Sequence, residues 1–197
     1  MGHWFGPKGP SSKGKGHPLM FSFKEAEHMG DFPEGGGYPH RFLQRAFEVL
    51  GVEDPSQVVH LCSGSIKTGI TVDIRPECNP TICCDARHTP LPSSSFRWIL
   101  CDPPYSQDYA TNLYGTGYAY PKPGELLAEA ERLLVPGGKV GMLHFQVPMF
   151  RHPLRLIGVY GITTGLGYAI RAFTVFEKEA PIQPRNPVPV PLPWKTN

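Results

Sequence analysis

The chain has 197 residues, of which 40% are hydrophobic, and a formal net charge of +2. This length suits one domain with a sizeable core, and the small charge excludes a protein that requires a polyanionic partner for charge balance. The sequence contains no apolar run of about 18 residues and no signal-peptide pattern. We therefore expect a soluble, cytoplasmic protein.

The first segment, residues 1–37, is rich in glycine, proline, lysine and histidine and shows no sustained periodicity. This composition predicts an irregular arm. The arm is locally basic, because Lys8, Lys13, Lys15 and Lys24 precede its first acidic residue. Such a segment is either solvated or in contact with phosphates.

A helix and four strands are predicted in the first half of the domain that we assign to residues 38–179. The helix begins near Pro39 and ends at Gly51, with apolar residues on one face (Phe42, Leu43, Ala46, Phe47 and Leu50). Four short apolar runs, each ended by Gly, Pro, Asp or Asn, then predict strands. These runs are Gln57–Cys62, Gly69–Asp73, Thr81–Cys84 and Arg97–Cys101.

A helix and three strands are predicted in the second half. The helix follows Pro123 and Gly124, and the sequence VPGG ends it. Lys139–Phe145 is the fifth predicted strand, while Leu154–Ile162 and Ala169–Glu177 predict an antiparallel pair at one edge of the sheet. Residues 180–197 are rich in proline and predict an extended tail, which packs on its own domain, is disordered, or docks on a partner or second copy.

The cysteines do not predict a metal site. Their number is odd, and they lack the paired C-x-x-C spacing of a zinc site (Cys62, Cys78, Cys83, Cys84 and Cys101). Three of them lie in strand-like runs. We therefore expect free thiols in a reducing cytoplasm and no metal.

Residues that can bind ligands follow each of the first four predicted strands. The sequence CSGS (62–65) follows the first strand, Asp73 the second, Asp85 the third and DPPY (102–105) the fourth. In an open α/β sheet, ligands bind at the carboxyl ends of the strands. Gly64 lets backbone amides approach a ligand closely, because it has no side chain and adopts many φ values.

Between Val58 and Lys178 the sequence resembles the class I S-adenosylmethionine-dependent methyltransferases, and among them the amino-group methyltransferases of nucleic acid bases. HLCSGS resembles their glycine-bearing first motif, VDIRPE the acidic end of the second strand, CCDA the third acidic turn, and LLVPGGKVGML the helix end and fifth strand. DPPY matches their catalytic tetrapeptide. The resemblance implies a single Rossmann-like α/β domain with a mostly parallel seven-stranded sheet, and S-adenosylmethionine as the cofactor.

The resemblance also implies roles for individual residues. Asp73 would accept both ribose hydroxyls of the cofactor, and Asp85 would accept a hydrogen bond from its adenine amine. The residues expected at the cofactor are His60, Cys62, Ser63, Gly64, Ser65, Asp73, Ile74, Asp85, Ala86 and Asp102.

At the catalytic tetrapeptide, the Asp102 carboxylate and the Pro103 carbonyl oxygen would accept the two protons of an exocyclic amine. Pro104 would help to hold the backbone, and the Tyr105 ring would stack on the base. The amine of a base is a poor nucleophile, because its lone pair is delocalised into the ring. Two acceptors would draw that pair back onto nitrogen.

Some features depart from the family pattern. His60 and Ile66 stand where the family carries an acid and a second glycine. Eight residues separate Gly64 from Asp73, too few for the usual first crossover helix, so we expect a shortened crossover. The arm or the Pro39 helix would then cover the vacated face. No segment is long enough for a target-recognition domain, so specificity is loose, supplied by a protein partner, or replaced by RNA shape.

The favoured function is methylation of adenine N6, with DNA preferred over RNA as the polymer; cytosine N4 and guanine N2 stay open. A non-catalytic module that keeps the fold and binds nucleic acid or protein is the competing hypothesis, and methylation of a protein amide or a small molecule is a third. The loop 106–122 carries four tyrosines (Tyr109, Tyr114, Tyr118 and Tyr120) that either stack on nucleotides or pack on the domain. His144 either faces the site or is structural.

Overall fold

The computed structural model of the chain describes residues 38, 41–113, 117, 120–163 and 168–181. Several predictions concern residues outside this part, namely 1–37, Pro39, Tyr114, Tyr118, 164–167 and 182–197. Among the described residues, no helix is both long and apolar enough to span a membrane.

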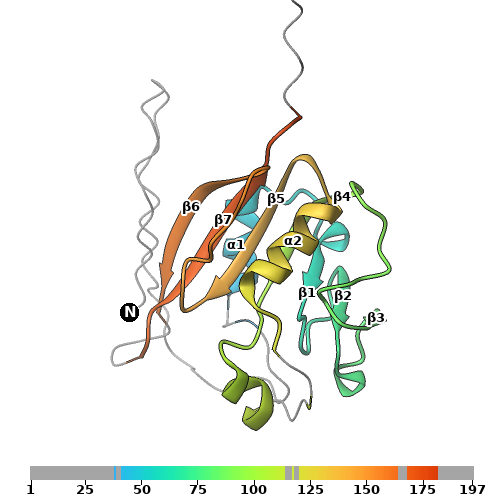
Figure 1. The fold of residues 1–197 in the computed structure, drawn as a ribbon, viewed down its shortest axis with the longest axis vertical. Helices are drawn as coiled ribbons and strands as arrows, with labels where there is room; N and C mark the ends of the chain where they lie inside the picture. Colours follow the sequence, from blue (N-terminus) through green and yellow to red (C-terminus); the bar gives the residue numbers. More distant parts are fainter. Residues whose placement is uncertain (1–37, 39–40, 114–116, 118–119, 164–167, 182–197) are drawn as a thin grey trace, which may run out of the picture.

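Within the described residues, the centre of the molecule is a seven-stranded sheet (Figure 1). Its strands are β1 (Val59–Leu61), β2 (Ile70–Asp73), β3 (Ile82–Cys83), β4 (Phe96–Cys101), β5 (Leu134–His144), β6 (Leu154–Ile162) and β7 (Arg171–Lys178). They lie in the order β3-β2-β1-β4-β5-β7-β6, with β1 to β5 parallel and β7 antiparallel to its neighbours β5 and β6. The predicted mostly parallel α/β sheet with an antiparallel edge is confirmed.

One face of the sheet is covered by α1 (Phe42–Leu50), which confirms the predicted helix. The Phe42 ring meets Phe173 of β7 edge-on, with ring centroids 5.0 Å apart. Gly51 ends the helix with a φ of 70°, a left-handed conformation that glycine adopts at little cost. Ile66, from the connection between β1 and β2, packs on the same apolar cluster as α1. The helix therefore covers the face that the short first crossover leaves without one.

The opposite face is covered by α2 (Pro123–Leu133). Its buried stripe, which includes Leu126 and Ala130, packs on Ile99 of β4. Proline suits the first turn of a helix, and the Glu125 carboxylate accepts a hydrogen bond from the backbone N–H of Lys122 at 2.8 Å. Figure 1 shows the sheet between the two helices.

The start of β5 corrects the prediction that this strand begins at Lys139. Leu134, directly after α2, already pairs with Phe96 of β4, and the register shifts before Trp98 pairs with Lys139. The intervening VPGG sequence forms a bulge, in which Gly137 has a φ of 77°. At Gly138 a Cβ atom would lie 2.9 Å from the Val135 carbonyl oxygen. The glycines bend the start of a strand, because the chain enters the sheet as soon as the helix ends.

The connection between β1 and β2 is short and contains no helix, as expected. It consists of residues 62–69, yet the two strands are parallel, an arrangement that normally needs a dozen or more connecting residues. A hydrogen bond from the Ile70 N–H to the Val58 carbonyl oxygen at 2.9 Å joins the starts of the two strands, where the connection ends. Gly69 is essential to it, since its φ is 77° and a Cβ atom would lie 2.4 Å from the Val58 oxygen.

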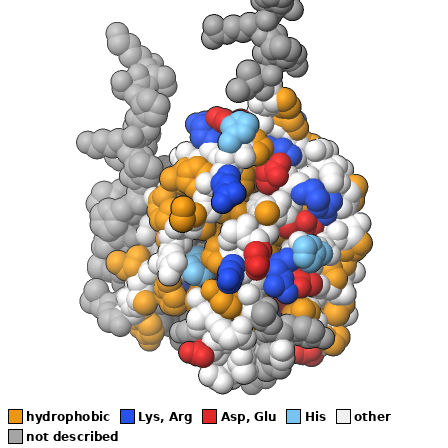
Figure 2. Space-filling view, viewed as in Figure 1, with side chains coloured by type: hydrophobic (Ala, Val, Ile, Leu, Met, Phe, Trp, Pro, Cys, Tyr) orange, Lys and Arg blue, Asp and Glu red, His pale blue; other side chains and the backbone are white. Residues whose placement is uncertain are grey.

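The face of the domain that Figure 2 shows is electrostatically mixed. Figure 2 shows lysine and arginine side chains interspersed with aspartate and glutamate over one face of the domain. This mixing agrees with the net charge of +2 and gives that face no extended area of one sign. The five cysteines are free, as expected.

Candidate active site

The carboxyl ends of β1 to β5 meet at one edge of the sheet, because these strands are parallel. The chain runs outward from β1 to β2 and β3, then returns to β4 on the other side of β1. The strand order therefore reverses between β1 and β4, the place where open α/β sheets bind ligands. The antiparallel β7 brings its first residue, Arg171, to the same edge.

Asp102 lies at this reversal point, directly after β4. Its backbone N–H donates to the Leu61 carbonyl oxygen of β1 at 3.4 Å. The side chain is half-buried, and its Oδ1 atom accepts a hydrogen bond from the Tyr105 hydroxyl at 3.1 Å. Burial raises the pKa of Asp102 to about 7, although Arg171 and the Tyr105 hydroxyl both oppose the increase. A carboxyl group with such a pKa can accept a proton near neutral pH.

The Tyr105 side chain contacts residues at the carboxyl end of β5 and the first residue of β7. Its ring centroid lies 5.5 Å from that of His144, in an edge-on arrangement, and 4.4 Å from that of Phe145. Its hydroxyl also accepts a hydrogen bond from Arg171 Nη1 at 3.0 Å. The predicted stacking of Tyr105 on a base stays a prediction.

His144 ends β5 and is buried next to Tyr105. Its Nδ1 atom accepts a hydrogen bond from the Gln146 N–H at 3.1 Å, which leaves the proton of the neutral ring on Nε2. That Nε2 atom is buried and has no hydrogen-bond partner in the described part of the chain. Both interpretations of His144 therefore stay open.

Asp73, at the end of β2, is buried and heavily hydrogen-bonded. Its Oδ2 atom accepts from the Gly64 N–H at 2.8 Å and from Arg75 Nη2 at 3.4 Å. Its Oδ1 atom accepts from the backbone N–H and from Nε of Arg75, at 3.0 and 3.1 Å. Asp73 thus ties the glycine loop to the end of β2, and a ribose hydroxyl would have to replace one of these donors.

Asp85, after β3, has the same local arrangement in a more exposed place. Its Oδ1 atom accepts from the Arg87 backbone N–H at 2.9 Å, and its Oδ2 atom accepts from Arg87 Nη2 at 2.6 Å. These hydrogen bonds from Arg87 lower the pKa of Asp85. The sequence pattern Asp-x-Arg therefore occurs at two neighbouring strand ends, and each aspartate is bound by the arginine two residues later.

The residues predicted from the first motif lie in two different places, the loop after β1 and the middle of β1. Gly64 has a φ of 55°, a left-handed conformation that favours glycine. Cys62 adopts the same conformation. Ser63 is buried, and its Oγ atom has no hydrogen-bond partner among the described residues. His60, by contrast, is buried in the middle of β1, where its ring lies near Tyr38 and Phe47 on the face covered by α1.

The remaining predicted cofactor residues occupy different surroundings. Ser65 and Ile74 are half-buried in the connections that follow β1 and β2. Ala86 is buried in the apolar cluster beneath α2. The contacts of all these residues with a cofactor stay predictions.

Two residues at this edge were not found by sequence reasoning. Tyr38 has a buried hydroxyl without a hydrogen-bond partner in the described residues, and burial followed by the nearby Asp102 raises its pKa well above the usual value. Arg171 contacts Tyr105, as described above. The predicted strand Ala169–Glu177 could have revealed Arg171, because the start of the returning strand must lie at the active-site edge.

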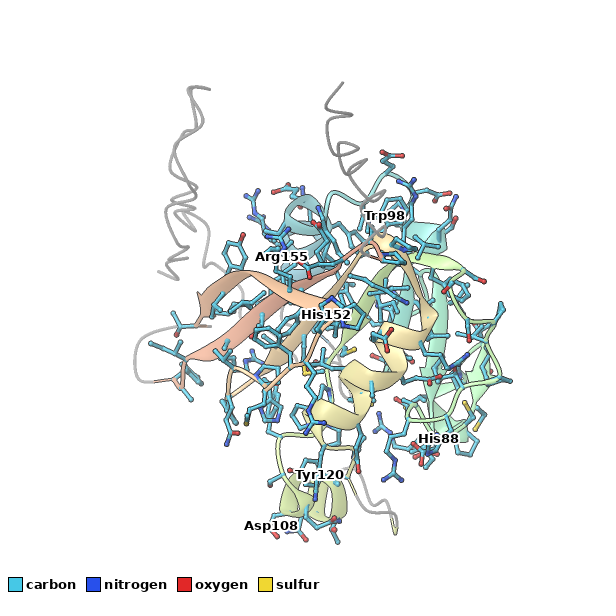
Figure 3. The ribbon with its side chains drawn as sticks, turned by 45° about the horizontal axis from the view of Figure 1, so that its top comes forward. His88, Trp98, Asp108, Tyr120, His152 and Arg155 are labelled. Carbon is cyan, nitrogen blue, oxygen red and sulfur yellow. The ribbon has the colours of Figure 1, made fainter. Side chains whose placement is uncertain are left out.

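The loop 106–122 is described in part. Residues Tyr109–Leu113 form a short π-helix, η3, which lies beyond the carboxyl ends of the strands. The Tyr120 N–H donates to the Gln107 side-chain oxygen at 3.2 Å. Figure 3 shows Tyr120 and Asp108 close to η3, at the end of the molecule opposite Trp98.

Comparisons with known proteins reveal similarity of structure. A scan of protein-family models gave no match, and a comparison with curated proteins gave none. One similar solved structure is the Haloferax volcanii complex between the Trm112 methyltransferase activator and a methyltransferase. The match covers 72% of this chain and 90% of the chain in that complex, with 15% identity and a TM-score of 0.50.

Two further solved structures are similar at lower scores. TrmN from Thermus thermophilus matches 68% of this chain with 20% identity and a TM-score of 0.48, and the present chain spans 47% of its length. The methyltransferase yhhF from Escherichia coli matches 76% of this chain and 92% of its own, with 11% identity and a TM-score of 0.49. The strand order and the Haloferax structure together show that the chain has the Rossmann-like fold of class I methyltransferases.

Proposed function

We propose that the chain is an S-adenosylmethionine-dependent methyltransferase that modifies an exocyclic amino group of a nucleic acid base, adenine N6 in DNA being the favoured target. The observation that supports this function best is the position of DPPY at the reversal point of the sheet. The half-buried carboxyl group of Asp102 lies there, next to the carboxyl end of β1, from which the glycine loop begins. Open α/β sheets bind their ligands at this reversal point.

In the proposed reaction, two oxygen atoms receive the amine. Tyr105 occupies Asp102 Oδ1, so Asp102 Oδ2 and the Pro103 carbonyl oxygen are the acceptors that we assign to the substrate. These contacts would localise the lone pair on the amine nitrogen and orient it. Asp102 Oδ2 would then take the proton that the nitrogen loses, which suits a carboxyl with a pKa of about 7.

The edge between β1 and β4 offers polar groups that fit the cofactor. S-adenosylmethionine supplies an electrophilic methyl group when it is bound. Ser63 Oγ and the Tyr38 hydroxyl are buried without partners among the described residues, and buried polar atoms normally have one. At Asp73, we propose that a ribose hydroxyl replaces Arg75 Nη2, which makes the longest of the four contacts at 3.4 Å.

An exposed aromatic side chain next to the tetrapeptide supports a planar substrate. Among the described residues, the large hydrophobic side chains that are exposed all lie in residues 145–150 and 168–170. Phe145, which contacts Tyr105, is 42% exposed. Exposed aromatic rings stack on unpaired bases, so we propose that Phe145 contacts the target base or its neighbour. A target inside a duplex would first have to be flipped out.

We propose that a protein partner supplies the specificity for the target site in the nucleic acid. The similar Haloferax structure is a complex with a methyltransferase activator, which supports this proposal by analogy. The preference for DNA over RNA, for adenine over cytosine N4 or guanine N2, and a cytoplasmic location are proposals that depend on the sequence resemblance.

The second candidate is a non-catalytic module that binds nucleic acid or protein. Asp73 favours it, because Gly64 and Arg75 already use both of its carboxylate oxygens. Titration calorimetry with S-adenosylmethionine distinguishes the two candidates. If the chain is an enzyme, S-adenosylmethionine should bind saturably. If it is a non-catalytic module, millimolar S-adenosylmethionine should give no heat of binding.

A direct test supplies methyl-labelled S-adenosylmethionine with separate pools of single-stranded DNA, duplex DNA, RNA and protein. We expect label in DNA and, after digestion, in N6-methyladenine. Asp102→Ala should abolish the label, whereas Asp108→Ala, an exposed aspartate of the following loop, should retain it. Equal labelling by the Asp102 variant and the wild type would refute the assignment.

A further inference from the structure

Arg171 reaches the DPPY sequence from a strand that is distant along the chain but begins at the same edge of the sheet. Arg171 is the first residue of β7, whereas Asp102 and Tyr105 follow β4, and β5 lies between these two strands. The Arg171 Nη1 atom is 3.0 Å from the Tyr105 oxygen, which is itself 3.1 Å from Asp102 Oδ1. The three side chains form a continuous hydrogen-bonded chain.

The direction of these hydrogen bonds is fixed by chemistry. A guanidinium group has donors and no acceptor, so the Tyr105 oxygen must accept from Arg171. The Tyr105 hydroxyl in turn donates its proton to Asp102 Oδ1. This arrangement favours an ionised Asp102, since a carboxylate accepts that proton and a guanidinium balances its charge.

We propose that Arg171 is a positioning residue that acts through Tyr105, keeping Asp102 ionised as a hydrogen-bond acceptor and directing its Oδ2 atom to the substrate. The need for an acceptor at Asp102 rests on the proposed function. The electrostatic effect of Arg171 on Asp102 does not, so the two can fail separately.

The other titratable groups around Asp102 cannot replace Arg171. Tyr38 before α1, Cys62 after β1 and Cys101 of β4 all have a pKa raised by burial, so they are neutral at pH 7. His144 of β5, which contacts Tyr105, has a pKa lowered by burial and is neutral as well. Among the described groups that influence Asp102, the positive charge comes from Arg171.

The test is an NMR titration of protein labelled with ¹³C at the aspartate side-chain carboxyl carbons. Asp102→Asn identifies the Asp102 signal by removing it. Arg171→Gln should move the midpoint of that signal upward by at least about one pH unit, because an adjacent opposite charge lowers a carboxyl pKa by about 1–3 units. Arg171→Lys, which keeps the charge, should move it by less than about half a unit.

Arg155→Gln is the matched control, because Arg155 lies on the neighbouring β6 and pairs with the partly exposed Glu177 and Glu179. It should leave the Asp102 midpoint unchanged. An unchanged midpoint in Arg171→Gln, or an equal change in Arg155→Gln, would overturn the proposal. If Arg171→Gln does not fold, Tyr105→Phe tests the same chain, and its failure to raise the midpoint would equally overturn the proposal.

Methyl transfer to single-stranded DNA from labelled S-adenosylmethionine provides the second readout. Arg171→Gln should lose about tenfold at pH 7 and recover most of this loss at pH 9, where Asp102 is ionised without help. A loss of the same size at both pH values would indicate a merely structural role and contradict the proposal. If the wild type transfers no methyl group, the proposed function fails, while the NMR result still decides the role of Arg171.

Discussion

Two parts of the ligand-binding edge hold their carboxylates in different ways. On the β2 and β3 side, Asp73 and Asp85 are each bound by an arginine two residues later. On the β4 side, Asp102 has no such local arginine, and Arg171 reaches it from another strand through a hydroxyl. The local pairs fix charged anchors, whereas the long-range arrangement leaves Asp102 with a pKa of about 7. The anchoring carboxylates, Asp73 and Asp85, and the carboxyl group proposed to react, Asp102, therefore lie at different strands of the same edge.

The largest expected effect on stability comes from Asp73→Ala. This change leaves the buried Gly64 N–H and the Arg75 guanidinium without their acceptor. Breaking a buried ion pair from one side costs about 3–5 kcal/mol of unfolding free energy. Urea denaturation measures the loss, and a change below about 1 kcal/mol would show that Asp73 does not anchor the loop.

Gly69→Ala tests whether the short crossover sets up that anchor. The new Cβ atom would lie 2.4 Å from the Val58 carbonyl oxygen at a φ of 77°, so we expect a loss of about 2–4 kcal/mol. Gly124→Ala in α2 is the control, because nothing lies within 4 Å of its added Cβ atom. Equal stability of the two variants in thermal or urea unfolding would contradict the proposed geometry.

Asp102→Asn should stabilise the protein above neutral pH. The pKa of Asp102 is about 7 in the folded state and about 3.9 in the unfolded chain, so between these values only the folded state holds the proton. Stability therefore falls as the pH rises from about 4 to about 7 and stays low above. The variant, which carries no charge, should be more stable by about 1–2 kcal/mol at pH 8 and equal at pH 4. Parity in urea denaturation at both pH values would show that burial does not perturb Asp102.

The smallest effect is expected for Arg87→Ala. The Asp85–Arg87 pair is partly exposed, with a closest distance of 2.6 Å, and such ion pairs contribute about 1 kcal/mol or less. Unfolding in low and in high salt should show a small difference that salt reduces. A loss as large as that of Asp73→Ala would mean that the two Asp-x-Arg pairs are equivalent, and would remove the distinction between a buried and an exposed anchor.

Sequence reasoning located the strand ends, because each apolar run stops at an acid, a glycine or a proline whose chemistry is visible locally. It therefore found the fold, the shortened crossover and the position of Asp102 directly after β4. It placed the start of β5 wrongly, since the VPGG bulge depends on pairing with Phe96 across the sheet. The donors to Asp73 and the chain from Arg171 to Asp102 were missed, because both depend on side-chain positions that spacing alone does not determine.

A crystal structure with S-adenosylhomocysteine and a single-stranded oligonucleotide that contains adenine would show directly whether Asp102 and Pro103 receive the amine. We expect an adenine whose N6 atom lies within about 3.2 Å of both Asp102 Oδ2 and the Pro103 carbonyl oxygen. An adenine bound elsewhere, with Asp102 turned away from both ligands, would contradict this expectation.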